Sequence, residues 1–212
     1  MRVTSVQMTL WAAEEHDAAC AFDSLRSVEH VTLSRGAWVE VKRSWIRGGF
    51  GLFDDLVASP QWRAEQRRMY DTVVDVPRLL RFFGTGDAMP WPELAEARDR
   101  LSAHYQSVLG EDFTSTGLCL YRDGRDSVAW HGDTLGRGAT HDTIVAVLSL
   151  GASRTFALRP KGSGQAIRMR LDHGDLIVMG GTCQRTWDHA IPKTARSIGP
   201  RVSVQFRPTG VS

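Results

Sequence analysis

The second half of the chain constrains the fold most, because it is a series of short apolar segments separated by turn residues. The turns carry Asp-Gly, Gly-Ser-Gly and His-Gly-Asp sequences, which favour tight chain reversal. The predicted strands are residues 117–121, 144–150, 154–159, 166–171, 175–179 and 201–207. Several short strands at this spacing are typical of a β-sandwich, a jelly roll or a barrel.

Two of these segments also indicate which of their faces are buried. Residues 201–207 (RVSVQFR) put two valines and a phenylalanine on one face, and polar residues including Arg201 and Arg207 on the other. Residues 144–150 (IVAVLSL) are almost continuously apolar, which is typical of a strand covered on both faces. One or two helices from the first half of the chain are expected to pack against these strands.

The first half of the chain has a mixed pattern, and charge and glycine content change near residue 115. Residues 37–42 (AWVEVK) alternate and predict a strand. Residues 52–70 are predicted to be helical, with an interruption at Pro60. Residues 92–109 form the best helix candidate, because a proline opens the segment and a glycine follows it. The fold class is α+β, and the length favours one domain of moderate size.

Composition excludes several classes of protein. The chain is 42% hydrophobic and 24% charged, as globular proteins are, and it has no apolar run long enough to span a membrane. Met1–Ala19 lacks the apolar stretch of a secretory signal, and the three cysteines contain no CxxC pair, so we expect a cytoplasmic protein without disulfides. A net charge of +2 excludes a polycation, while the 23 arginines beside 3 lysines fit a codon bias as well as phosphate contacts.

One short motif has the residue types of a metal site. His131 and Asp133 lie two residues apart, so on a strand both side chains point the same way. His189 is the leading candidate for a third ligand, and two histidines with one carboxylate form the facial triad of non-haem Fe(II) oxygenases. A His-x-Asp pair also occurs by chance in surface loops, and the set could hold Zn²⁺ in a hydrolase. The remaining histidines are interpreted as ordinary polar residues: His16, His30, His104, His141 and His173.

The polar face of 201–207 carries two arginines, and their charges need a partner or solvent. An arginine inside a sandwich or barrel is costly unless an anion pairs with it, and a dicarboxylate ligand would supply that partner for Arg201 and Arg207. The alternative is that both arginines are solvated and protect a sheet edge.

Taken together, these motifs resemble one family. The order Tyr121, His131-x-Asp133, His189, Arg201-x5-Arg207 is similar to that of the AlkB family of Fe(II)- and 2-oxoglutarate-dependent dioxygenases. The similar segments are residues 120–133, 147–161, 173–194 and 201–208, with a further likeness at 68–84 to the nucleotide-recognition region. The resemblance implies a single domain over 1–212. Its double-stranded β-helix (jelly-roll) core would span about 115–208, with N-terminal helices and a nucleotide-recognition lid in about 1–114.

The resemblance also implies roles for individual residues. Iron would be held by His131, Asp133 and His189. The cosubstrate 2-oxoglutarate would be bound by Tyr121, Arg201, Ser203 and Arg207, with Arg201 on its distal carboxylate and Arg207 near its other end. The chain departs from the family at three positions: Cys119 and Ser203 each replace an asparagine, and Leu135 replaces an acidic residue that several members carry at the base-contacting edge.

The implied activity is oxidative dealkylation of N-alkylated bases in DNA with Fe(II), 2-oxoglutarate and O2. Hydroxylation of the N-alkyl carbon would give a hemiaminal that collapses to an aldehyde and the repaired base. The alternatives are an RNA or protein demethylase on the same core, or a nucleic-acid-binding relative with weak or no activity. The expected partner is alkylated DNA, single- or double-stranded, or RNA; we expect a monomer that does not bind membranes.

Candidate nucleic-acid contacts follow from the need to take a base out of its stack. Trp187 and Trp130 are candidates for the pocket wall, and core packing is the alternative for both. Phosphate contacts are expected from Arg78, Arg81, Arg154 and Arg159, with Lys161 nearby. Arg63, Arg67 and Arg68 are interpreted as a solvated helix face. Phe82 and Phe83 are interpreted as core, with a wedge between bases as the alternative.

Overall fold

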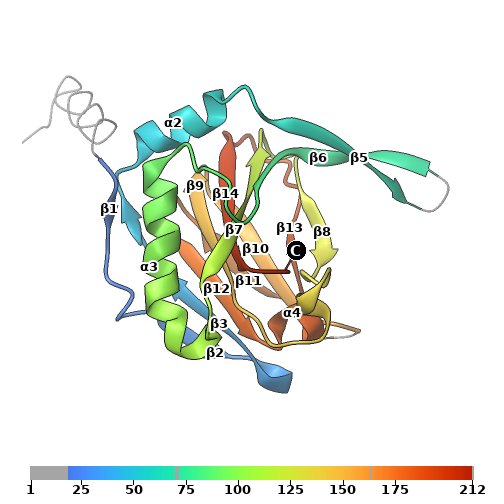
Figure 1. The fold of residues 1–212 in the computed structure, drawn as a ribbon. Helices are drawn as coiled ribbons and strands as arrows, with labels where there is room; N and C mark the ends of the chain where they lie inside the picture. Colours follow the sequence, from blue (N-terminus) through green and yellow to red (C-terminus); the bar gives the residue numbers. More distant parts are fainter. Residues whose placement is uncertain (1–18, 70–71, 163, 212) are drawn as a thin grey trace, which may run out of the picture.

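Two antiparallel sheets carry the fold of the computed structural model, which describes residues 19–69, 72–162 and 164–211 (Figure 1). In this part of the chain the larger sheet has the order β2 (Glu29–Thr32), β3 (Ala37–Lys42), β12 (Leu176–Gly181), β9 (Val145–Gly151), β14 (Arg201–Pro208), β7 (Phe113–Tyr121), β6 (Thr72–Phe83) and β5 (Arg63–Met69). The smaller sheet has the order β11 (Ile167–Leu171), β10 (Arg154–Pro160), β13 (Trp187–Ile191) and β8 (Val128–His131). The other elements are β1 (Ala21–Phe22), β4 (Ile46–Arg47), α2 (Phe50–Ala58), α3 (Pro92–Leu109), α4 (Cys183–Thr186) and the short 3-10 turns Ser34–Gly36 and Arg137–Ala139.

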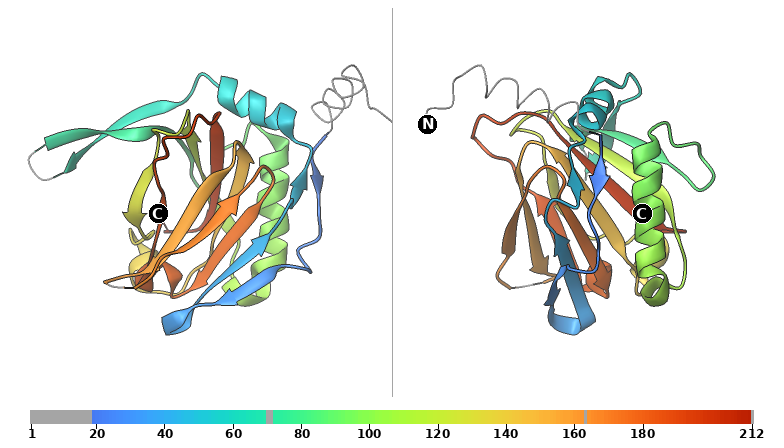
Figure 2. Two further views of the ribbon diagram at one scale, coloured as in Figure 1. Left: turned by 180° about the vertical axis from the view of Figure 1, so that it is seen from behind. Right: turned by 90° about the vertical axis from the view of Figure 1, so that its left-hand side faces the viewer.

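The two sheets face each other across one apolar cluster, and helices α2 and α3 cover the outer side of the larger sheet. Val147 and Ile177 of the larger sheet pack in the same cluster as Phe156 and Leu158 of the smaller sheet. A second cluster joins the larger sheet to α2 and α3, and Figure 2 shows α3 lying along this outer side. The arrangement is a two-sheet sandwich, one of the architectures that the strand pattern favours, and it agrees with the jelly roll that the resemblance implies.

The alternation predicted for 201–207 is confirmed by β14. Val202, Val204 and Phe206 belong to the cluster under the helices. Arg201 and Arg207 therefore project toward the space between the sheets. The prediction for 144–150 is also confirmed, since β9 contributes residues to both clusters.

The helix predicted at 92–109 is confirmed with the same bounds. Pro92 occupies the first turn of α3, where its missing N–H costs nothing. Gly110 ends the helix in a left-handed conformation (φ 73°), which glycine adopts without strain. The strand predicted at 37–42 is confirmed as β3.

The helix predicted over 52–70 is wrong in its second half. Helix α2 ends at Ala58, and residues 63–69 form β5, which pairs antiparallel with β6. The segment RAEQRRM consists of good helix formers and lacks alternation, so its local propensity opposes the observed strand. Pairing with β6 decides the outcome, and the resulting hairpin projects from the body of the molecule (Figure 1).

The change in composition near residue 115 is not a structural boundary. Strand β3 pairs with β12, and β6 pairs with β7, so strands from the first half extend the sheet of the second half. No helix among the described residues is long and apolar enough to cross a membrane.

Candidate active site

The structure brings the three predicted ligand residues together. His131 ends β8 and lies directly across from His189 on the neighbouring β13, because the two strands pair in that register. The imidazole rings are 4.2 Å apart between centroids, and the His131 Nε2 atom lies 3.8 Å from the Asp133 Oδ1 atom. One ligand atom from each of the three side chains lies within 4.8 Å of the other two, as a shared metal ion requires.

The turn that carries Asp133 is held by a residue that the sequence did not indicate. The Asp133 backbone N–H donates to Gln184 Oε1 on α4 (2.8 Å), and Gln184 is buried. A Cβ atom at Gly132 would lie 2.2 Å from the Gln184 carbonyl oxygen, so only glycine fits between the two ligands. Gln184 thus fixes the backbone of the metal-binding turn.

The charges at the three residues suit a divalent cation. The Arg207 Nε atom donates to Asp133 Oδ2 (2.6 Å). Burial alone would raise the pKa of Asp133, but Arg207 and the two histidines outweigh it and hold that pKa well below its usual range. Burial, with a smaller effect of His131, lowers the pKa of His189 to about 3, so this imidazole is neutral and offers its lone pair. Two imidazoles and a carboxylate fit Fe(II) in particular.

Arg201 is a buried cation without an anion in the described part of the chain. Its side chain is 0% exposed, and its Nε atom donates to Ser149 Oγ (2.9 Å). Both terminal nitrogens, Nη1 and Nη2, lack a partner among the described residues. The guanidinium lies over the ring of Tyr121, 5.3 Å from its centroid. A carboxylate would satisfy both nitrogens at once, so the site fits a ligand with an anionic end.

Ser203 lies on the same polar face and is bound by a residue that was not among the predicted site residues. Gln205 donates from Nε2 to the Ser203 hydroxyl (2.6 Å) and to its carbonyl (3.0 Å). The Cys119 thiol is 3.7 Å from Gln205 Oε1. An amide therefore does lie in this region, contributed by Gln205, and its position two residues from Ser203 on an alternating strand is the signal that could have found it.

Arg154 does not occupy the position expected of a phosphate contact. It is 3% exposed and donates to the carbonyl oxygens of Asp123 (3.1 Å), Asp126 (2.7 Å) and Pro192 (2.9 Å). A guanidinium that binds three backbone carbonyls holds loops together and is not available at the surface. The expectation for Arg154 is corrected on this ground.

Trp187 likewise belongs to the core and not to a pocket wall. It is 5% exposed, packs in the cluster between the sheets and donates from Nε1 to the Ser34 carbonyl (3.2 Å). Trp130 is half-buried, and the exposed guanidinium of Arg159 stacks over its ring at 4.3 Å. Arg159 also lies 3.6 Å from Asp188, so its guanidinium has a partner within the protein.

A groove of about 1180 Å³ runs from the ligand residues to the β5–β6 hairpin. It is lined by residues of β5, β6, β7 and β14, by the loop after α2, and by His131 and the turn that follows it. Arg78 and Arg81, which were expected to contact phosphates outside the pocket, line this groove. Arg78 donates to the Ser127 carbonyl (3.2 Å) and Arg81 to Ser59 Oγ (2.9 Å).

The two phenylalanines of β6 differ in exposure. Phe82 is 59% exposed and lines the groove, so its assignment to the core is wrong. Phe83 is buried, and its assignment to the core is confirmed. Side chains alternate along a strand, so Phe82 and Phe83 lie on opposite faces of β6. Because the neighbouring segment 52–70 was predicted to be helical, this alternation was not recognised in the sequence.

His173 is an ordinary polar residue that makes hydrogen bonds within the protein, as predicted. Its Nδ1 atom accepts from the Gly151 N–H (3.0 Å), and its Nε2 atom therefore donates to the Gly48 carbonyl (2.8 Å). His16 lies outside the described residues.

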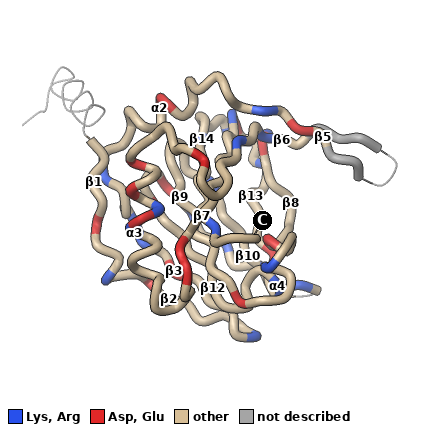
Figure 3. Tube along the Cα trace, viewed as in Figure 1, with Lys and Arg blue, Asp and Glu red and all other residues tan. Residues whose placement is uncertain are grey.

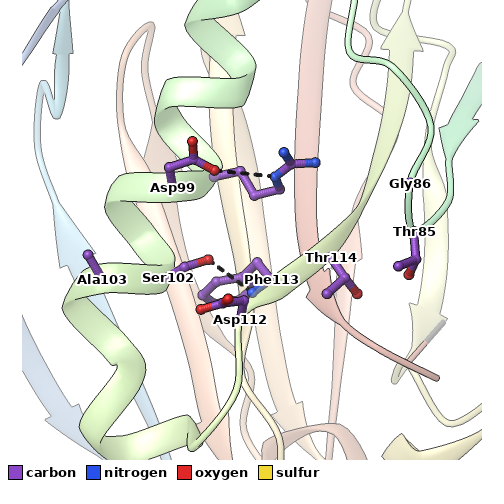
Figure 4. Close-up of a pocket in the computed structure, with 9 residues that line it drawn as sticks. Thr85, Gly86, Asp99, Ser102, Ala103, Asp112, Phe113 and Thr114 are labelled. Carbon is purple, nitrogen blue, oxygen red and sulfur yellow. Dashed lines mark hydrogen bonds and ion pairs between the residues drawn. The ribbon is translucent and has the colours of Figure 1, made fainter.

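A second hollow lies between α3 and the segment before it, away from the ligand residues (Figure 4). Some of its polar side chains have partners within the protein: Ser102 Oγ accepts from the Phe113 N–H (3.0 Å), and Arg98 lies 3.7 Å from Asp99.

The fold and site together define a metal-binding jelly-roll protein with the two-histidine, one-carboxylate set of non-haem Fe(II) oxygenases. Residues 84–207 match the profile of the 2OG-Fe(II) oxygenase superfamily, and the chain belongs to this superfamily as an AlkB-like member. Membership implies Fe(II), 2-oxoglutarate and O2, which fit the three ligand residues and the unpaired guanidinium of Arg201.

Curated relatives and a solved structure agree with this placement. The chain is 33% identical over 204 residues to "Alpha-ketoglutarate-dependent dioxygenase alkB homolog 3" of Homo sapiens, covering 85% of this chain and 66% of the relative. It is 33% identical over 157 residues to "DNA oxidative demethylase ALKBH2" of Bos taurus, covering 69% of this chain and 54% of the relative. The chain thus spans less than two thirds of these relatives. The structure of OsALKBH1 superposes with a TM-score of 0.55 at 14% identity, over 85% of this chain and 100% of that one, which supports the fold.

Proposed function

We propose that this protein catalyses Fe(II)- and 2-oxoglutarate-dependent oxidative dealkylation of N-alkylated bases, with DNA as its substrate. The observation that carries the proposal is the buried Arg201, whose terminal nitrogens lack an anion in the described structure. It lies on the same face of β14 as Arg207, which donates to Asp133 of the His–Asp–His set. The names of two relatives, a DNA oxidative demethylase and an alpha-ketoglutarate-dependent dioxygenase, support the reaction class.

The ligand residues would bind the metal ion through atoms that the surrounding protein holds in place. Fe(II) with 2-oxoglutarate and O2 would supply the oxidising chemistry when bound. His131, Asp133 and His189 would bind the ion, and Arg207 occupies Oδ2 of Asp133 so that Oδ1 remains free for it. Gln184 keeps the turn in place through the Asp133 N–H.

The polar face of β14 would orient the cosubstrate. Arg201 would donate from both terminal nitrogens to its distal carboxylate. Burial raises the pKa of Tyr121, so its hydroxyl stays protonated and can donate a hydrogen bond. Because both residues are buried, water is excluded from the ion pair that Arg201 would form.

The groove would receive the alkylated base after it leaves its stack. Phe82 offers an exposed aromatic face, and Arg78 and Arg81 contribute positive charge beside it. The β5–β6 hairpin would act as the nucleotide-recognition lid, because it projects beside the groove and contributes residues to its lining (Figure 1). Arg159, whose side chain is exposed, is a candidate phosphate contact.

The proposal is tested by mass spectrometry of oligonucleotides that each carry one N-methyl base, incubated with Fe(II), 2-oxoglutarate and O2. Single-stranded DNA, duplex DNA and RNA of matched sequence are compared at equal concentration. We expect loss of one methyl mass from DNA, and no loss with the His131→Ala variant. Faster loss from RNA would overturn the assignment to DNA, and no loss from any oligonucleotide would overturn the reaction.

A further inference from the structure

We infer that Gln205 is a positioning residue that turns the hydroxyl proton of Ser203 toward 2-oxoglutarate bound between the two sheets. The inference rests on the proposed function and adds to it a residue that acts through its neighbour. It is carried by three hydrogen bonds of the Gln205 amide and by the register of the strands around it.

Ser203 lies within the polar face of β14. It is 4% exposed and follows Arg201 by two residues, about 7 Å along the strand. The strand register places Cys119 of β7 on one side of it and Ser149 of β9 on the other. Ser149 Oγ already accepts from Arg201. A cosubstrate whose distal carboxylate is held by Arg201 would therefore have Ser203 beside it as it extends toward the metal ligands.

The Gln205 amide fixes the hydroxyl of Ser203. Its Nε2 atom donates one hydrogen to the Ser203 Oγ atom (2.6 Å) and the other to the Ser203 carbonyl oxygen (3.0 Å). Both amide hydrogens are used in this way, so the hydroxyl accepts from Gln205 and keeps its own proton for another partner. Among the described residues that proton has no acceptor, and it is free to point into the space that the cosubstrate would occupy.

Two neighbours on β7 set the direction of the amide. The Cys119 thiol donates to Gln205 Oε1 (3.7 Å), which favours the amide orientation with its oxygen toward β7 and its nitrogen toward Ser203. A Cβ atom at Gly117 would lie 2.9 Å from the same oxygen, so glycine leaves the room that the amide needs. Cys119 and Ser203 stand where the family has asparagines, and Gln205 brings an amide back to the space beside both.

The cations of the groove do not replace this contact. Arg78 and Arg81 line the same groove as Gln205, and Figure 3 shows Lys and Arg positions along β5 and β6. Both arginines donate to oxygen atoms of the protein. They belong to β6 and not to the polar face of β14, where Ser203 offers its proton.

Fixing the hydroxyl strengthens its bond to an anionic ligand. A hydroxyl that donates to a carboxylate forms a charge-assisted hydrogen bond, which is stronger than a bond between neutral groups. Without Gln205 the Ser203 hydroxyl would rotate freely, and ligand binding would have to order it. Gln205 therefore raises the affinity for the cosubstrate without touching it.

The test measures the affinity for 2-oxoglutarate by calorimetry with Mn²⁺ in place of Fe(II), so that binding is observed without turnover. Gln205→Met removes the amide at similar volume, and Ser203→Ala removes the hydroxyl. We expect each substitution to weaken binding about tenfold, as for the loss of one charge-assisted hydrogen bond. The double variant should also bind about tenfold more weakly than wild type, because both substitutions remove the same contact.

A matched variant and a stability measurement exclude a general effect on the fold. Gln106→Met makes the same substitution on the exposed surface of α3 and should bind 2-oxoglutarate as wild type does. Thermal unfolding of each variant shows that the titrated protein is folded. Ser203→Ala is the smaller change within the site, so it tests the contact even if Gln205→Met does not fold.

The outcomes separate the two proposals. Wild-type affinity in folded Gln205→Met or in Ser203→Ala would overturn the inference and leave the proposed function intact. A loss of about 100-fold in the double variant would show that the two residues act independently, which also contradicts the inference. If wild-type protein loaded with Mn²⁺ does not bind 2-oxoglutarate, the proposed function fails, and the inference fails with it.

Discussion

Two buried arginines lie over the same tyrosine ring and have opposite roles. The guanidinium of Arg154 lies 5.4 Å from the centroid of Tyr121, and that of Arg201 lies 5.3 Å from it. Arg154 donates to three backbone carbonyls. Arg201 donates to one serine, and its terminal nitrogens lack partners in the described structure.

The difference teaches how to separate a structural cation from a ligand-binding one. Burial lowers the pKa of both arginines, so both pay the same kind of desolvation cost. Backbone carbonyls offset that cost at Arg154. At Arg201 the cost is offset only when an anion arrives, so substitution should affect folding at the first position and ligand binding at the second.

The largest expected effect on folding is at Arg154. Arg154→Met keeps the apolar volume but leaves three buried carbonyls without a donor, which should reduce the free energy of unfolding by about 3–5 kcal/mol. Urea denaturation followed by tryptophan fluorescence measures this. A loss below about 1 kcal/mol would show that Arg154 is not the structural member of the pair.

The second expected effect is at Arg201. Arg201→Met should change the free energy of unfolding by no more than about 1 kcal/mol without ligand, because it removes an uncompensated charge along with one hydrogen bond. It should weaken 2-oxoglutarate binding at least about 100-fold, measured by calorimetry with Mn²⁺ in place of Fe(II). If Arg201→Met strongly reduced the free energy of unfolding and bound 2-oxoglutarate normally, Arg201 would be a structural cation, contrary to the comparison.

Gln184 sharpens the comparison, because its contact is internal like those of Arg154 but lies beside the ligand residues. Gln184→Met removes the acceptor for the Asp133 N–H at similar volume, and should lower metal affinity about tenfold or more. Competition with a fluorescent chelator measures the affinity of the folded protein for Mn²⁺. Unchanged affinity would show that the turn does not need this hydrogen bond.

The smallest expected effect concerns how stability depends on pH. It involves His173, which, like Arg154, makes its hydrogen bonds to backbone groups of other segments. Burial lowers the pKa of His173, so the folded state favours the neutral ring and the unfolded state binds the proton at higher pH. Stability from this residue is therefore present above about pH 6.5 and is lost as the pH falls below that value, through the lowered pKa of the folded state.

Unfolding of wild type and His173→Asn at several pH values checks this contribution. The variant should lose about 1–2 kcal/mol at pH 7 and show a shallower fall between pH 7 and 5. Parallel curves for the two proteins would contradict the role assigned to the neutral ring.

The sequence predicted those parts of the fold whose local pattern and tertiary environment agree. Helix α3 and strands β3 and β14 have a regular period and clear ends, and they formed as predicted. Strand β5 did not, because its residues favour a helix and only its pairing with β6 makes it a strand.

The site is likewise divided between features that the sequence shows and features that depend on tertiary contacts. The residue types and order of His131, Asp133, His189 and Arg201 were visible in the sequence. Which arginine lacks a partner, and that Gln184 holds the turn, depends on contacts between distant segments that no spacing encodes. Arg154 and Trp187 have the right residue type for a nucleic-acid contact, but burial removes them from it.

The central claim is that the His–Asp–His set and Arg201 form one site for Fe(II) and 2-oxoglutarate. An anaerobic titration followed by visible absorption tests it most directly, since the Fe(II)–2-oxoglutarate complex has its own absorption band. We predict that the band appears with wild-type protein only when both components are present, and is absent in His131→Ala. No band in wild-type protein that binds both components would contradict the claim.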